Sequence, residues 1–143
     1  MYVIGGRDDA GGLLPTVEAY NPQTNTWRSC PPMRQRRVCA VAGVVGGSLV
    51  VCGGMNDDGY LASAEAYTAE TGWTPLPPLP HAADSDTACV LDGKLFVVGG
   101  YKCSKLQVWD GTSWTCKADL PAAPSRATGA MHAGKILWRS HFQ

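Results

Sequence analysis

Glycine doublets close three apolar segments of this chain at a nearly constant spacing. The segments lie at 1–6, 49–54 and 95–100, and read MYVIGG, LVVCGG and LFVVGG. The first glycines of successive doublets are therefore 48 and then 46 residues apart. A period of about 20 to 50 residues is typical of chains built from stacked units that cannot bury their apolar faces alone. The doublets thus predict a repeat architecture.

An aromatic pair follows each doublet. The pairs are Tyr20 and Trp27, Tyr67 and Trp73, and Trp109 and Trp114. The separation of Trp27 from Gly53 equals that of Trp73 from Gly99, at 26 residues in both repeats. Because Trp and Tyr combine a large rigid area with polar atoms that can find partners, they suit the packing of one sheet on another.

The residues between these markers predict short β-strands. Segments 38–45, 87–91 and 127–131 alternate small and apolar residues, whereas the segments that end in the doublets are continuously apolar, as central strands are. Gly46-Gly47 and Asp92-Gly93 suit two-residue hairpin turns, which require positive φ. Gly and Pro account for 17 and 10 of the 143 residues, which disfavours a helical bundle. We therefore expect an all-β chain of four-stranded antiparallel meanders.

The order of glycine doublet, tyrosine and tryptophan resembles the kelch repeat, whose four-stranded sheets form the blades of a β-propeller. The segments VEAYNPQTNTW and PPMRQRRVCAV are similar in particular to intracellular kelch proteins of the BTB-kelch and F-box-kelch type. In the third repeat, Trp109 stands in place of the tyrosine and Gln107 in place of the glutamate. The resemblance implies a structural role for Gly5, Gly6, Tyr20, Trp27, Gly53, Gly54, Tyr67, Trp73, Gly99, Gly100, Trp109 and Trp114.

The expected strand order begins and ends within a repeat. We expect a kelch-repeat region over 1–143, with repeat one at 1–34, repeat two at 35–80, repeat three at 81–121 and a partial fourth at 122–143. A closed propeller has about four to eight blades. The sequence therefore predicts about three four-stranded blades in a ring that is incomplete at both ends.

A meander places the loops that enter each blade, and the loops that follow each doublet, at one edge. In related kelch proteins this edge commonly receives a peptide of the partner. The resemblance implies contacts from an arginine before the first strand and from a hydroxyl residue before the Glu-x-Tyr segment, which here are Arg37, Thr16 and Ser63. Arg36, Asp57 and Asp58 are expected at the same edge.

The arginines of this edge favour a protein or peptide ligand of acidic character, because the planar guanidinium binds carboxylates through two parallel hydrogen bonds. Two other interpretations of MRQRR stay open: a solvated basic loop, and a nuclear-localisation or nucleic-acid patch. Asp57 and Asp58 also suit a turn, and a calcium site would need more converging carboxylates. Twelve basic residues balance twelve acidic ones, so the chain as a whole has no electrostatic attraction to nucleic acid or to an anionic membrane.

The functional hypothesis is a protein-interaction module of kelch type. In that family such modules include substrate-recognition parts of ubiquitin ligases and proteins that bind the cytoskeleton. The alternative is part of a kelch-like propeller enzyme, of the galactose oxidase type or a sugar-acid epimerase. His81, His132 and His141 form no metal-spaced pair, and neither a nucleophile elbow nor a phosphate loop is present. We therefore expect no catalysis, no metal and no cofactor.

The six cysteines are widely spread and form no C-x-x-C pair. The sequence shows no signal peptide and no apolar stretch near the about 20 residues of a membrane helix. These features favour reduced thiols and a cytoplasmic location, with the nucleus as the alternative. Cys39, Cys52 and Cys89 lie in apolar runs, so we expect them to be buried, with redox sensing and zinc binding as alternatives.

An open arc of blades would expose aromatic faces and sheet edges, which favours association. We predict that the chain expressed alone is poorly soluble or self-associated. Sedimentation velocity combined with thermal melting tests this expectation, and a monodisperse monomer that melts cooperatively would contradict it.

Overall fold

The computed structural model describes residues 1–84, 87–100, 103–120, 127–132 and 135–140, and of residues 118, 127–132 and 135–140 it describes the backbone alone. All regular structure in these residues is β-strand. The first sheet holds β1 (Tyr2–Ile4), β2 (Val17–Asn21) and β3 (Thr26–Cys30). The second sheet holds β4 (Val41–Val45), β5 (Ser48–Cys52), β8 (Ala64–Thr68) and β9 (Gly72–Leu76).

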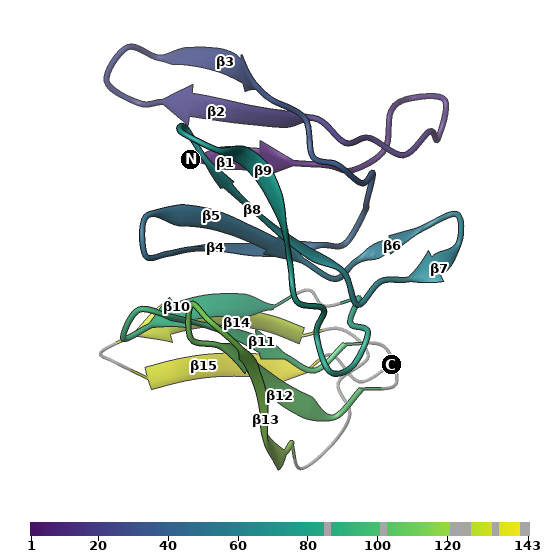
Figure 1. Cartoon of the computed structure of the whole chain (residues 1–143), viewed down its shortest axis with the longest axis vertical. Coiled ribbons are helices and arrows are strands. Elements are labelled where there is room, and N and C mark those ends of the chain that lie inside the picture. The colour runs from purple at the N-terminus through teal and green to yellow at the C-terminus, as the bar shows by residue number, and fades with distance from the viewer. Residues whose placement is uncertain (85–86, 101–102, 121–126, 133–134, 141–143) are drawn as a thin grey trace.

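The third sheet holds β10 (Ala88–Leu91), β11 (Lys94–Val98), β12 (Lys105–Trp109) and β13 (Trp114–Asp119). Two smaller sheets are the hairpin β6 (Met55–Asn56) with β7 (Gly59–Tyr60), and the pair β14 (Ala127–His132) with β15 (Lys135–Ser140). Every strand pairing among these residues is antiparallel. Figure 1 shows the sheets stacked along the long axis of the molecule, with the first sheet at the top.

The predicted all-β fold is thereby confirmed as part of a propeller. The strands follow one another within each sheet in chain order, apart from the inserted hairpin β6–β7. No ring closes among the described strands. The described residues contain no helix with the length and apolar character that a membrane span requires.

Two apolar clusters fill the spaces between neighbouring sheets, and β5 contributes to both. Val51 packs with Val17 of the first sheet, whereas Val50 and Cys52 pack with Leu95 of the third. Successive side chains of a strand point to opposite faces, so a strand covered on both sides must be apolar at every position. This requirement explains why the segments that end in the doublets carry no polar alternation.

The first two glycine doublets lie where their sheet meets the loop that enters the next one. Gly53 has a φ of +65°, and a Cβ on it would lie 2.2 Å from the carbonyl oxygen of Ala83. The amide of Gly54 donates to that same oxygen at 2.7 Å. Gly5 and Gly6 form the same arrangement with the carbonyl oxygen of Arg37, at 2.3 Å from the constructed Cβ and 3.0 Å from the amide nitrogen. Only glycine allows the two backbones to come this close.

The aromatic pairs join neighbouring sheets through main-chain carbonyls. Ring centroids in the three pairs are 5.0, 5.4 and 5.3 Å apart, with rings tilted by 43°. Trp73 Nε1 donates to the carbonyl of Pro31 at 2.8 Å, and Trp114 Nε1 donates to the carbonyl of Pro77 at 3.0 Å. Trp27 lies on the face of the first sheet that no described sheet covers, and 51% of it is exposed. The aromatic residues thus align each sheet on the segment before it.

Two local expectations were wrong. The strand expected over 38–45 begins only at Val41, because Val38 pairs with Met55 of β6 through two backbone hydrogen bonds of 2.9 and 3.0 Å. Cys39 is exposed rather than buried, since its backbone is left-handed, with a φ of +54°, ahead of the strand. Cys89 is half-buried, whereas Cys52 is fully buried, and its burial raises the pKa of its thiol to about 12. None of the six cysteines forms a disulfide bond.

The doublet geometry predicts a position-dependent cost for adding one methyl group. Gly53→Ala forces a Cβ against the Ala83 carbonyl and is expected to lower the free energy of unfolding by about 3 kcal/mol. Gly46→Ala is the matched control, because its φ of +57° is similar but no atom lies within 4 Å of the added Cβ. Its cost is about 1 kcal/mol, from the left-handed backbone alone. Urea unfolding measures both, and equal losses would contradict the proposed packing role.

Candidate functional site

Two kinds of loop lie together at one edge of the stacked sheets, here termed the loop edge. It comprises 5–16, 31–40, 53–63, 77–84, 99–100 and 103–104. The opposite edge, termed the turn edge, comprises the tight turns 22–25, 46–47, 69–71, 92–93 and 110–113. In Figure 1 the hairpin β6–β7 projects from the loop edge on the right, and the turn between β4 and β5 lies on the left.

Arg37 lies buried within the loop edge, with 1% of its surface exposed. Its Nη2 lies 2.9 Å from Oε1 of Glu65 on β8. Its Nη1 donates to the carbonyl oxygens of Gly53 at 2.8 Å and Ser63 at 3.1 Å. A buried guanidinium is stable only when such partners replace water. Arg37 therefore fixes the entering loop 31–40 on the second sheet.

The other groups around Arg37 complete this network. The hydroxyl of Ser63 accepts from Arg37 Nη2 at 3.2 Å and donates to Oε1 of Gln35 at 2.5 Å. The second carboxylate oxygen of Glu65 accepts from the amide of Arg34 at 2.8 Å. Within the described part of the chain, the Nε of Arg37 is left without a hydrogen-bond partner. The carboxylate of Glu65 thus binds both the side chain and the backbone of the same loop.

The third sheet anchors its entering loop with a neutral group at the equivalent place. Ala83 occupies the place of Arg37, because its carbonyl accepts the backbone amide of Gly54, just as the Arg37 carbonyl accepts the backbone amide of Gly6. Gln107 occupies the place of Glu65. Its side-chain oxygen Oε1 accepts from the backbone amide of His81 at 2.9 Å, and its Nε2 donates to the backbone carbonyl of His81 at 3.1 Å. The acidic group is therefore present where the loop supplies an arginine, and the amide where it does not.

Lys105 occupies the position that Ser63 has in the second sheet. The amide of Gly53 donates to the Ser63 carbonyl at 3.1 Å, and the amide of Gly99 donates to the Lys105 carbonyl at 3.0 Å. The ammonium of Lys105 forms a salt bridge of 2.5 Å with Asp119, and this hydrogen bond raises the pKa of Lys105. Thr16 holds the same place in the first sheet, is exposed, and accepts the Gly5 amide at 2.8 Å through its carbonyl.

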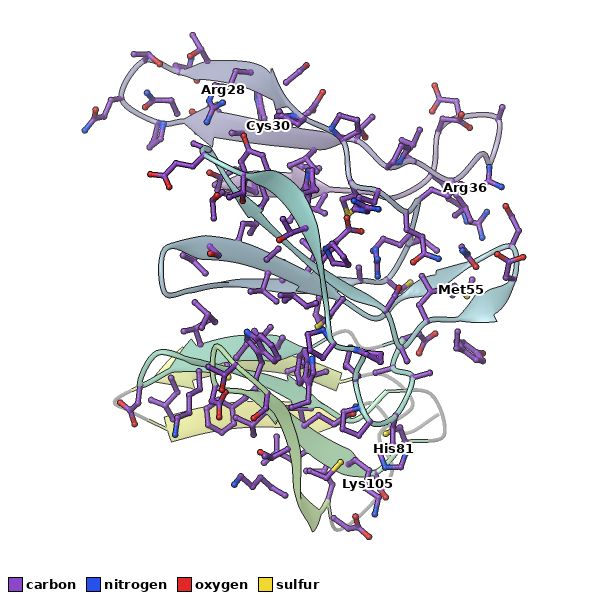
Figure 2. The ribbon with its side chains drawn as sticks, in the orientation of Figure 1. Arg28, Cys30, Arg36, Met55, His81 and Lys105 are labelled. Atoms are coloured by element: carbon purple, nitrogen blue, oxygen red, sulfur yellow. The ribbon has the colours of Figure 1, made fainter. Side chains whose placement is uncertain are left out.

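Arg36 and Asp57 form an exposed ion pair beside the buried network. Arg36 Nη2 lies 2.7 Å from Asp57 Oδ2, and the two side chains are 57% and 63% exposed. Figure 2 shows Arg36 at the loop edge, on the same side of the molecule as Met55 of β6. Asp58 is exposed in the same hairpin, where its amide donates to Asn56 at 2.9 Å. Solvent can therefore reach the charges of this pair.

The structure thus brings the predicted residues together in two groups of different character. Arg37 contacts Ser63 inside the edge, and Arg36 contacts Asp57 at its surface, while Thr16 lies one sheet away. Sequence reasoning missed Glu65 and Gln35 as the partners of Arg37. The glutamate at the second position of AEAY is the signal that could have suggested a buried cation nearby.

Metal-binding residue types do not gather in the described residues. No group of three His, Cys, Asp or Glu side chains there could hold an ion. His81 is exposed and bonds Gln107 through its backbone, whereas His141 lies outside the described residues and only the backbone of His132 is described.

The buried and exposed ion pairs are expected to differ sharply in their contribution to stability. Glu65→Ala leaves the buried charge of Arg37 uncompensated and should lower the free energy of unfolding by about 3 to 5 kcal/mol. Arg36→Ala removes an exposed pair and should change it by about 0.5 kcal/mol or less. Replacing Arg37 and Glu65 together by methionine should cost less than Glu65→Ala, because no buried charge remains. Urea unfolding of the variants tests this order, and equal effects at Glu65 and Arg36 would contradict it.

Comparison with known proteins gives a consistent family assignment. The family model described as Kelch motif matches residues 1–34 and 36–80, which is more than half of the chain. Kelch-like protein 33 of Homo sapiens is 38% identical over 103 residues, covering 70% of this chain and 19% of that protein. Kelch-like protein 41b of Danio rerio is 32% identical over 108 residues, covering 75% of this chain and 18% of that protein.

One relative matches nearly the whole chain. Kelch-like protein 35 of Mus musculus is 30% identical over 142 residues, which covers 95% of this chain and 24% of that protein. The chain therefore spans less than a quarter of the length of these relatives. The glycine doublets, the aromatic pairs and the antiparallel sheets agree with the matched motif, and the chain belongs to the kelch-repeat family.

Proposed function

We propose that the loop edge of this chain is a protein-binding surface, and that the chain acts as an interaction module. The main support for this proposal is the exposed Arg36–Asp57 pair. Arg36 lies in a loop that the buried Arg37–Glu65 pair holds in place. Binding residues concentrate on loops that a rigid scaffold positions, because ordering such loops on binding costs little entropy.

The proposal divides the arginines of this edge between two roles. Arg36 contacts the partner, together with the exposed side chains of Thr16, Asp57 and Asp58, whereas the hydroxyl of half-buried Ser63 is already bonded to Arg37 and Gln35. Arg37 positions the loop, because its guanidinium is already bonded to Glu65 and Ser63 in a buried place. A ligand would reach Arg37 only after displacing that carboxylate.

An acidic peptide fits the exposed arginine best. Exposed ion pairs contribute about 1 kcal/mol or less, so Arg36 can exchange the Asp57 carboxylate for a carboxylate of the ligand at little cost. The guanidinium then binds the new carboxylate through parallel hydrogen bonds. Asp57, once released, is available to a cation or amide of the same peptide.

The wider role that we propose is substrate recognition for a ubiquitin ligase or binding to the cytoskeleton, in the cytoplasm. Support comes from the kelch-like relatives, whose chains extend well beyond the matched region.

We also propose that the repeats divide at 1–34, 35–80, 81–121 and 122–143. The uncovered face around Trp27 is proposed to drive self-association.

A peptide library displayed on phage tests the binding surface. The immobilised chain should enrich peptides with acidic residues, and Arg36→Glu should weaken capture of the enriched peptides by about tenfold or more, because it replaces attraction by repulsion. Lys94→Glu is the matched control, since it reverses an exposed charge at the start of β11, by the turn edge.

Three results would separate the possible outcomes of this selection. Loss with Arg36→Glu and retention with Lys94→Glu supports the loop edge. Equal loss with both variants would indicate attraction to net charge alone. Unchanged capture by Arg36→Glu would contradict the assigned contact.

A further inference from the structure

A cavity lies at the turn edge, between the first and second sheets. It has a volume of about 310 Å³ and is separate from the loop edge. Its walls come from the first sheet through Tyr2 and Arg28, and from the second sheet through Val44, Leu49 and Tyr67. Thr68, at the end of β8, also lines the cavity, and the turns add Gly47 and Ala69. A cavity of this size is in the range that holds a small ligand, about 300 to 1,000 Å³.

Arg28 faces this cavity because of the pleat of β3. Residues two apart on a strand point to the same face, and Cys30 packs into the apolar cluster between the first and second sheets. Arg28 therefore lies on the face toward the second sheet, whereas Trp27 points away. Figure 2 shows Arg28 and Cys30 along the same strand.

The cation and one of the phenol groups of this cavity are open to solvent, since Arg28 is exposed and Tyr2 is 41% exposed, whereas the Thr68 hydroxyl is already bonded to Thr71. Within the described part of the chain, the guanidinium of Arg28 has neither an ion pair nor a hydrogen bond, and the hydroxyl groups of Tyr2 and Tyr67 have no hydrogen bond. The described residues that line the cavity include no carboxylate. A positive charge, two phenol groups and an apolar wall thus converge without an internal anion.

The equivalent cavity between the second and third sheets has the opposite chemistry. Its volume is about 250 Å³, and its ionisable residue is Asp110. The Asp110 carboxylate accepts the amides of Thr112 and Ser113, each at 2.8 Å, so the turn itself satisfies it. These hydrogen bonds lower the pKa of Asp110 to about 2. Of these two cavities, the one between the first and second sheets therefore offers an unpaired charge to a ligand.

We propose that the cavity between the first and second sheets binds a carboxylate attached to a compact apolar body. Arg28 holds the carboxylate through its planar fork, and the Tyr67 hydroxyl donates a further hydrogen bond. The rings of Tyr2 and Tyr67, with Val44 and Leu49, cover the apolar body. A free aryl carboxylate and the carboxyl terminus of a peptide ending in an aromatic residue share this chemistry.

An NMR titration of the ¹⁵N-labelled chain with sodium phenylacetate tests the proposal. Shifts are expected at Gly47, Leu49 and Tyr67, and not at Gly93 or Gly111 of the equivalent cavity. Arg28→Gln should weaken binding by about tenfold, in line with the loss of charge-assisted hydrogen bonds. Tyr67→Phe should weaken it by a smaller factor, because it removes one hydroxyl and keeps the ring. Amide spectra of both variants establish that they fold.

Lys94→Gln serves as the matched control, because it removes one exposed positive charge near the equivalent turn, and binding should be unchanged. Tripeptides ending in phenylalanine, as the free acid and as the amide, distinguish the two sources of the carboxylate. Binding of phenylacetate alone identifies a small-molecule site, and binding of the free-acid peptide identifies a chain-terminus site. Absence of binding by every probe, equal shifts in both cavities, or undiminished binding by Arg28→Gln would overturn the proposal.

Discussion

The contact between each of the first two glycine doublets and a carbonyl of the following loop determines how the first three sheets of this chain stack. The amides of Gly6 and Gly54 bond the carbonyls of Arg37 and Ala83, and the preceding glycine of each doublet leaves no room for a Cβ. This close approach fixes where the next loop enters, and hence where the next first strand can pair. The apolar clusters, the position of the loops and the cavities between sheets all follow from that spacing.

The loop edge combines a buried charge with an exposed one, and the two have different consequences. Arg37 and Glu65 hold the loop in place, in surroundings where both charges are bonded and desolvated. Arg36 and Asp57 stand in solvent on the same loop and hairpin, where a partner can replace either charge. The third sheet shows that the anchor need not be ionic, since Gln107 holds the loop around Ala83 through the His81 backbone.

The sequence was sufficient to predict the antiparallel sheets, because doublets and aromatic residues act through local backbone geometry and strand alternation. It could not predict that Val38 pairs with Met55, since this pairing depends on how the loop after Gly54 folds back. The same applies to Cys39, whose apolar neighbours suggested burial although its left-handed backbone exposes it. Arg36 and Arg37 are adjacent and chemically identical. Only the tertiary positions of Glu65 and Asp57 show that Arg37 is buried and Arg36 exposed.

The indole groups of Trp73 and Trp114 donate to the carbonyls of Pro31 and Pro77, and the amides of Gly6 and Gly54 likewise bond carbonyls of the following loop. In each of these hydrogen bonds between sheets, here termed joints, the acceptor is therefore a main-chain oxygen, which every amino acid carries. Substitution of the residue that supplies this oxygen leaves the joint intact, provided that the backbone keeps its path. Interaction surfaces can consequently diversify from repeat to repeat while the architecture is kept, provided that the glycines and tryptophans of these contacts are retained.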